Sequence, residues 1–226
     1  MRRYMVNTVL GGAVLFLGAC STATTQAPSA NPSGFLTGKF YKGKDGQALM
    51  VYVDPDAQWR QYDKILIDPV TLWSDAETSN LPKGEAQQLQ NYLDKSLRRE
   101  LKKDYTLVDR PGPGVMRLRV AITEAEGSSH VQDTVSAAGS DSQLSPGSSP
   151  IAGGTSKFVA AAGIEGELRD AMTNDRLAAA IDRRVGEKSL KRESQTWADI
   201  ENAFDYWSRR LRARLAQLRS GQTLTE

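Results

Sequence analysis

Apolar and polar residues alternate most clearly over residues 116–122, where Arg117 and Arg119 alternate with apolar side chains. A period of two is typical of a β-strand with one buried face. Shorter apolar runs predict further strands at residues 49–53, 65–67 and 105–108. The first two of these runs stop at Asp-Pro pairs, where proline cannot donate to a strand ladder.

Residues 159–186 contain two more alternating runs. In the first, Ile164 and Leu168 share one face, and the opposite face carries Glu165, Glu167 and Arg169. We expect this charged face to be solvent-exposed and its acids to pair with arginines on neighbouring strands, namely Arg117, Arg119, Arg183 or Arg184. The second run predicts one apolar face, made of Leu177, Ala179, Ile181 and Val185. The turn residues Thr173-Asn174-Asp175 lie between the runs and predict a hairpin.

A leucine recurs every four residues between Leu89 and Leu101, which is the spacing of one helix face. We expect this helix to be capped by Ser79 or Asn80 and to hold Pro82 in its first turn.

A second helix is predicted near the C-terminus, where Thr196–Asp199 fits a capping box. Its apolar positions are spaced by three and four residues and are Trp197, Ile200, Phe204, Trp207, Leu211, Leu215 and Leu218. Such a stripe must cover another apolar surface. We therefore predict an α+β fold, a mixed, mostly antiparallel sheet of about four to six strands with two main amphipathic helices packed on one face.

The first nineteen residues have the order of a secretory leader, with Arg2 and Arg3, an apolar run over 9–17, and the sequence Leu17-Gly18-Ala19-Cys20. The apolar run is shorter than the roughly 20 residues that a membrane-spanning helix needs. The last four residues resemble the bacterial lipoprotein processing box. This resemblance implies cleavage of residues 1–19 and a diacylglyceryl and fatty acyl (palmitate-type) lipid on Cys20.

Residues 20–33 contain small and polar side chains and predict a flexible tether with a reach on the order of 40 Å. Residues 34–226 are then expected to form a single domain. Within this domain, residues 127–156 are rich in Gly, Ser, Ala and Pro without a period, so we expect a low-complexity loop.

Charge and cysteine content narrow the classes of function. Two of the 29 Lys and Arg residues lie in the leader, so 27 basic residues face 27 acidic ones in the rest of the chain. A balanced charge gives no reason to expect a nucleic acid partner. Because Cys20 is the single cysteine, no internal disulfide can form.

Several short motifs follow one another along the chain. They are Ser33–Leu36, Tyr62–Val70 leading to Trp73, Gly112–Arg119, Ile164–Asp170, and Trp197 followed by Trp207. Together they resemble a family of bacterial lipoproteins known as domain-of-unknown-function family 3313. The resemblance implies a compartment and a fold but no reaction. The chain departs from the family pattern after Asp170, which leaves the type of the hairpin turn open.

Few residues have the spacing of a catalytic or metal site. Glu165 and Glu167 could act as paired acids or bind calcium, but a ladder of surface charges is the interpretation we favour. His130 lies in the unpatterned loop without a cysteine nearby, so neither catalysis by histidine nor a metal site is indicated. The arginines of the last helix form a solvated face or contact anionic lipid or peptidoglycan; they are Arg209, Arg210, Arg212, Arg214 and Arg219.

The candidate partner contacts are apolar side chains outside the periodic elements. Trp73 is expected to be an exposed recognition aromatic. The loop at 127–156 contributes Val131, Val135, Leu144 and Ile151, which a pure spacer would not need.

We therefore expect a non-enzymatic, lipid-anchored interaction module of the cell envelope, with another envelope protein as partner and no cofactor besides the lipid. Ser21 follows the lipidated cysteine, which favours the outer membrane. The alternatives are an envelope hydrolase that uses carboxylates such as Asp68 and Glu165, and a carrier of lipid or another small ligand.

Overall fold

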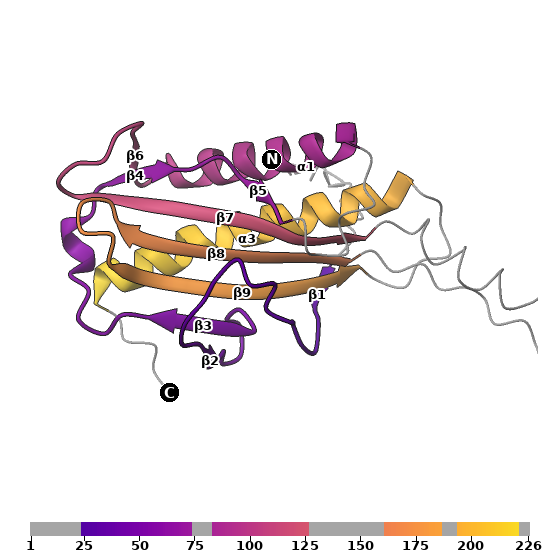
Figure 1. Cartoon of the computed structure of the whole chain (residues 1–226), viewed down its shortest axis with the longest axis horizontal. Coiled ribbons are helices and arrows are strands. Elements are labelled where there is room, and N and C mark those ends of the chain that lie inside the picture. The colour runs from indigo at the N-terminus through magenta and orange to yellow at the C-terminus, as the bar shows by residue number, and fades with distance from the viewer. Residues whose placement is uncertain (1–23, 74–82, 127–160, 187–193, 222–226) are drawn as a thin grey trace, which may run out of the picture.

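The computed structural model describes residues 24–73, 83–126, 161–186 and 194–221 (Figure 1). The helices are α1 (Lys83–Leu101), α3 (Ser194–Ser220) and the short 3-10 helix η1 (Trp59–Gln61). The strands are β1 (Thr24–Gln26), β2 (Tyr41–Lys42), β3 (Met50–Val53), β4 (Lys64–Ile67), β5 (Thr71–Leu72), β6 (Thr106–Leu107), β7 (Val115–Glu126), β8 (Ala161–Asp170) and β9 (Arg176–Gly186).

Within these residues the strands form one nine-stranded sheet in the order β2-β3-β9-β8-β7-β4-β6, with β1 added to β9 and β5 to β7. Along this order, the neighbours β2-β3-β9-β8-β7 pair antiparallel. Strands β4 and β5 pair in parallel with β7, and β6 pairs in parallel with β4. The α+β class and the mixed sheet are confirmed. The sheet has more strands than expected because β1, β2 and β5 are only two or three residues long, too short to show a period.

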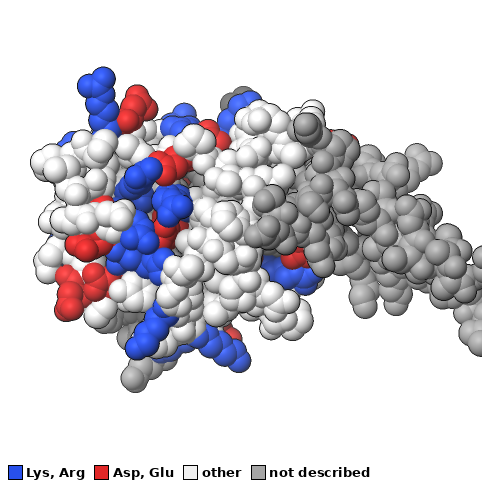
Figure 2. Space-filling model, in the orientation of Figure 1, with Lys and Arg blue, Asp and Glu red and all other residues white. Residues whose placement is uncertain are grey.

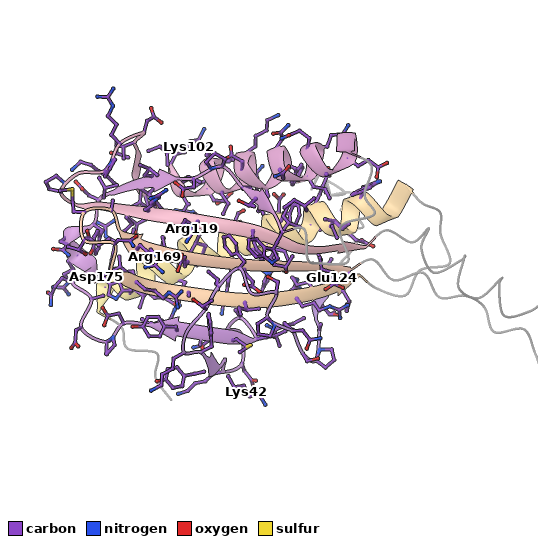
Figure 3. All side chains as sticks on the ribbon, viewed as in Figure 1. Lys42, Lys102, Arg119, Glu124, Arg169 and Asp175 are labelled. Carbon is purple, nitrogen blue, oxygen red and sulfur yellow. The ribbon has the colours of Figure 1, made fainter. Side chains whose placement is uncertain are left out.

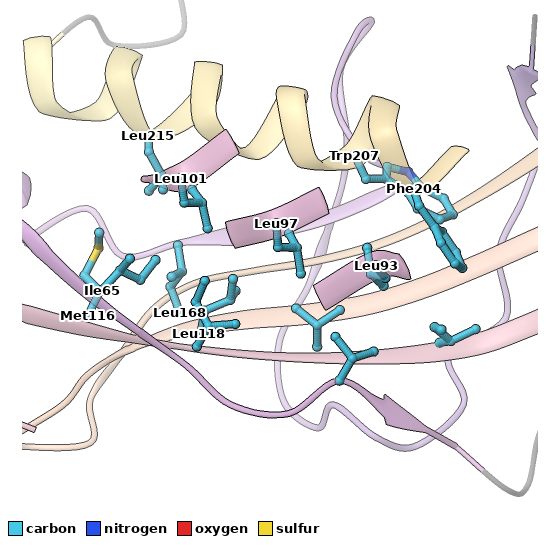
Figure 4. Close-up of a cluster of buried hydrophobic side chains, with 14 of the residues drawn as sticks. Ile65, Leu93, Leu97, Leu101, Met116, Leu118, Leu168, Phe204, Trp207 and Leu215 are labelled. Atoms are coloured by element: carbon cyan, nitrogen blue, oxygen red, sulfur yellow. The ribbon is translucent and has the colours of Figure 1, made fainter. Parts of the chain in front are cut away.

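One face of the sheet packs against both helices and forms the main core (Figure 4). Figure 1 shows α3 running behind β8 and β9, with α1 alongside the β4 edge. The leucine repeat of α1 is confirmed, since all four leucines from Leu89 to Leu101 are buried. They pack with the apolar positions of β7, which are Met116, Leu118, Val120 and Ile122.

The apolar stripe of α3 is also confirmed as core, and Phe204 and Leu215 are almost fully buried. The helix begins at Ser194, two residues before the expected cap. The predicted capping box at Thr196–Asp199 is therefore wrong, because Thr196 lies within the helix rather than before it.

Trp207 of α3 connects the core to a buried carboxylate. Its indole Nε1 donates a hydrogen bond to Asp182 Oδ2 at 2.7 Å. Asp182 Oδ1 accepts hydrogen bonds from Gln26 Nε2 at 2.7 Å and from the backbone N–H of Leu49 at 3.2 Å. A single aspartate on β9 thus joins α3, β1 and the start of β3.

The second run of the hairpin does not keep one apolar face. Leu168 pairs with Ala178 but Arg169 pairs with Arg176, so Leu177 is an extra residue in β9. This bulge turns Leu177 toward the helices, whereas Ala179 and Ile181 lie on the opposite face. The prediction that Leu177 shares a face with Ala179 and Ile181 is wrong, because one inserted residue reverses the alternation.

The opposite face, called the outer face here, is partly covered by the N-terminal segment, residues 24–47 (Figure 1). Leu36 of this segment is buried against Ala179 and Ile181. β1 pairs with β9, and Ala27 directly after it is buried. The predicted tether over 20–33 and domain start at 34 are therefore wrong from Thr24 onward, because backbone pairing orders this segment without large apolar side chains.

We predict that Trp207→Ala lowers the free energy of unfolding by about 3 to 5 kcal/mol, because it empties a core position and removes a donor from Asp182. Chemical denaturation of the soluble domain followed by circular dichroism measures this change. Arg209→Ala, at an exposed position of the same helix, is the control and should change the value by less than about 0.5 kcal/mol. Equal midpoints for wild type and Trp207→Ala would contradict a core role.

Candidate functional site

Charged side chains gather at the centre of the outer face, where Lys and Arg atoms lie among Asp and Glu atoms (Figure 2). Two neighbouring strands supply most of them. The alternation of β7 turns Arg117 and Arg119 to this face, and the antiparallel register sets them opposite Arg169 and Glu167 of β8. The alternation of side chains along β7 and β8 therefore brings these charged groups together on one face.

Glu167 is the centre of this group, and its side chain is 1% exposed. Its Oε1 accepts from Arg119 Nη1 at 2.6 Å, and its Oε2 lies 3.0 Å from Nη2 of both Arg169 and Arg176. Figure 3 shows Arg119 and Arg169 close together on β7 and β8, in the half of the sheet nearer the β8–β9 turn. We call these four residues the arginine–glutamate cluster.

Two opposing effects set the pKa of Glu167. Burial raises the pKa, and the guanidinium groups of Arg169 and Arg176 lower it. The arginines outweigh burial, so the pKa of Glu167 lies below its usual value of 4.5. The carboxylate is therefore ionised at neutral pH and holds three cations in fixed positions.

Glu165, two residues before Glu167, is fully buried. Its Oε1 accepts from the backbone N–H of Ser33 at 2.5 Å, and its Oε2 accepts from the backbone N–H of Leu36 at 2.9 Å. The expectation that Glu165 and Glu167 lie on a solvent face is wrong, because the N-terminal segment covers this face. The predicted pairing of arginines across strands is confirmed for Arg119 with Glu167.

The N-terminal segment also brings the Phe35 ring to this face, where it meets Trp73, the residue after β5. Phe35 lies under the guanidinium of Arg119, 5.2 Å from its ring centroid, and packs edge-on against Trp73 at 5.4 Å. The indole Nε1 of Trp73 donates to the carbonyl oxygen of Ser33 at 3.1 Å. Trp73 is thus half-buried and held in place, and is not the exposed aromatic that we expected.

A shallow groove of about 450 Å³ opens beside the Phe35 ring. It is lined by Phe35, Asp68, Pro69, Thr71, Arg117, Arg119 and Val120. The Arg117 guanidinium is held by Asp68, with Nε 3.0 Å from both carboxylate oxygens. Arg117 and Arg119 remain 47% and 39% exposed. The groove therefore presents two oriented guanidinium groups and an aromatic ring to a ligand.

A comparison with family models matches residues 31–211 to "Protein of unknown function (DUF3313)". The chain belongs to the DUF3313 family. The matched range contains the arginine–glutamate cluster, the groove and the part of the N-terminal segment that covers Glu165. The predicted family membership is confirmed. A search of curated proteins found no match.

Solved structures similar to this DUF3313 protein include three of bacterial origin. The PelC dodecamer from Paraburkholderia phytofirmans is 13% identical, with 72% of this chain and 94% of that chain covered and a TM-score of 0.38. Protein XCC0632 from Xanthomonas campestris is 15% identical, with 76% and 96% covered and a TM-score of 0.43. Lipoprotein GNA1162 from Neisseria meningitidis is 10% identical, with 64% and 97% covered and a TM-score of 0.32. At these TM-scores we base no conclusion on the likenesses.

The other predicted site residues of the DUF3313 protein lie outside the described residues. They are the lipidation site Cys20 and the loop positions Val131, Val135, Leu144 and Ile151. In the described part of the chain no group of three or more His, Cys, Asp or Glu side chains is placed to hold a metal ion. None of the helices described there is long and apolar enough to cross a membrane.

The two carboxylates considered for hydrolysis are both engaged by other groups. Asp68 binds the Arg117 guanidinium, and Glu165 binds two backbone N–H groups while fully buried. Sequence patterns missed Phe35 and Arg176, because neither lies in an alternating run beside Glu167. The sequence offered one signal for these partners, which is the presence of two glutamates on the same strand face. Carboxylates need cations or hydrogen-bond donors as partners wherever they are buried.

We predict that Glu167→Gln lowers the free energy of unfolding at pH 7 by about 3 kcal/mol or more, since it leaves three arginines around a neutral amide. The contribution of ionised Glu167 is present above its unfolded pKa, about 4.5, and is lost as the pH falls toward its lower folded pKa. The stability difference between wild type and variant should therefore shrink on acidification.

Denaturant titrations at a series of pH values test this prediction. Asp63→Asn is the control, because the Asp63 side chain is 65% exposed and its removal should cost little. A difference between wild type and Glu167→Gln that stayed constant from neutral to strongly acidic pH would exclude the proposed ionised state.

Proposed function

We propose that this DUF3313 protein is a lipid-anchored protein of the bacterial outer membrane that binds another envelope protein through the groove on its outer face and catalyses no reaction. The anchor is supported by the leader and the sequence Leu17-Gly18-Ala19-Cys20. Ser21 after the cysteine supports the outer membrane as the destination. The observation that carries the binding role is the pair of half-exposed, oriented guanidinium groups in the groove.

Both guanidinium groups are ordered before any partner arrives. Glu167 fixes Arg119, whose guanidinium also rests on the Phe35 ring, and Asp68 fixes Arg117. Because these long side chains are already held, little conformational entropy is lost when they bind. Arginine and aromatic side chains are also the types that contribute most to protein interfaces.

The groove favours a protein segment with a carboxylate or a backbone carbonyl as its acceptor. A guanidinium bound to one carboxylate keeps further N–H donors, which can reach a second acceptor. The groove is shallow, so an extended segment or a loop fits better than a deeply enclosed small ligand. Peptidoglycan and anionic lipid offer similar acceptors and are outcomes that the experiment below separates.

We predict that Cys20→Ser abolishes lipid attachment and leaves uncleaved or mislocalised precursor, because lipid transfer requires the thiol. Labelling of cells with a clickable fatty acid, followed by separation of inner and outer membranes, measures both effects. The wild-type protein should carry the label in the outer membrane. Label on the serine variant would contradict lipidation at Cys20, and wild-type protein confined to the inner membrane would contradict the destination.

We predict that a photo-crosslinking amino acid at Thr71, an exposed residue of the groove, gives a discrete protein adduct in cells. The additional substitution Arg117→Glu should reduce this adduct at least tenfold, because it reverses a charge that faces the partner. The same crosslinker at Lys95, an exposed residue of α1, is the control.

Digestion of the adduct identifies the class of partner. After proteolysis and mass spectrometry, peptides of a second protein identify a protein partner, a muropeptide released by muramidase but still linked to the Thr71 peptide identifies peptidoglycan, and a phospholipid mass on that peptide identifies lipid. Identical adducts from Thr71 and Lys95, or a Thr71 adduct that Arg117→Glu leaves unchanged, would exclude the groove as the binding surface.

A further inference from the structure

The N-terminal segment is fixed to the sheet from Thr24 onward. β1 pairs with the last residues of β9, with Thr24 opposite Gly186 and Gln26 opposite Arg184. The Arg184 side chain donates to Thr24 Oγ1 at 2.9 Å and to the Thr24 carbonyl oxygen. Gln26 Nε2 donates to Asp182, and the backbone N–H of the buried Ala27 donates to the Arg183 carbonyl oxygen at 2.9 Å.

This pairing sets where the chain enters the fold. β1 is antiparallel to β9, so the residues before Thr24 leave at the end of the sheet where β9 ends at Gly186. β7 ends and β8 begins at the same end, since Glu126 pairs with Ala161. We call this the anchored end; the turn between β8 and β9, residues 171–175, lies at the opposite end (Figure 1).

The distance from the anchored end to Cys20 is limited by covalent geometry. Three residues lie between Cys20 and Thr24, and a fully extended chain spans at most about 14 Å over these four Cα-to-Cα steps. The eleven residues of β9, at about 3.3 Å per residue, place the opposite end roughly 33 Å farther away. A lipid on Cys20 would therefore hold one end of the sheet close to the bilayer surface.

We propose that pairing of β1 with β9 keeps the anchored end at the polar surface of the bilayer and leaves the β8–β9 turn away from it. This inference rests on the lipidation of Cys20 proposed above. With this pairing, the domain is attached close to the bilayer and in one orientation, and not through the long flexible tether expected from the sequence.

The described surface offers little that would hold the long faces of the domain flat on the lipid. Its exposed large hydrophobic side chains are Tyr41 and Met172, and insertion into a bilayer requires a wider apolar area. Arg119 lies seven residues before the end of β7, so the groove stands roughly 23 Å from the anchored end along the strand. At that height the groove faces a protein rather than the lipid headgroups.

Two single-cysteine variants test the orientation in the full lipidated protein. Thr25→Cys labels the exposed side of β1 near the anchored end, and Met172→Cys labels the opposite end, where the side chain is 63% exposed. Each is the one free thiol, because Cys20 is the single cysteine and carries the lipid. The protein is reconstituted into phosphatidylethanolamine and phosphatidylglycerol vesicles that carry an energy acceptor on the headgroup.

We expect several-fold stronger energy transfer from the label at position 25 than from the label at 172. Twenty Gly and Ser residues inserted between Ser21 and Thr22 should remove this difference, because they lengthen the tether without touching β1. Equal transfer from both labels without the insertion would overturn the inference. Flotation with the vesicles reports lipid attachment separately, so protein that fails to float would instead contradict the proposed lipidation.

Discussion

The outer face of the sheet depends on one physical constraint, which is that a buried carboxylate must be paired. Removing Glu165 and Glu167 from water costs several kcal/mol each unless charges or hydrogen bonds replace the solvent. Three arginines satisfy Glu167, and two backbone N–H groups of the N-terminal segment satisfy Glu165. The hydrogen bonds to Glu165 tie the N-terminal segment to the sheet, and the positions of Phe35 and the groove follow from them.

The two faces of the sheet thus have different physical roles. On the helix face, large apolar side chains such as Phe204 and Met116 are buried and provide the hydrophobic free energy of folding. On the outer face, the polar pairs contribute less net stability, because desolvation offsets much of their attraction. They specify instead where the N-terminal segment lies and how Arg117 and Arg119 are oriented.

The sequence predicted the elements whose pattern is long and local. The leucines of α1, the stripe of α3 and the alternation of β7 each repeat over several turns or residue pairs, so the period identifies the element and its buried side. Alternation in β8 separated Glu165 and Glu167 from Leu168 correctly. It could not show that the charged face is covered, because Ser33, whose backbone N–H binds Glu165, is 132 residues away from it in the chain. Leu177 was misplaced because a single bulge leaves no trace in the pattern.

The same covering segment joins β1, where the described chain begins, to the groove. Phe35, which supports Arg119, lies on the chain that begins at β1 and passes over Glu165. The hydrogen bonds of Thr24 and Gln26 hold the start of this segment, and those of Ser33 and Leu36 hold its middle. The pairs at Glu165 protect Phe35 from displacement. The start of the described chain at β1 and the groove are therefore two parts of one ordered segment.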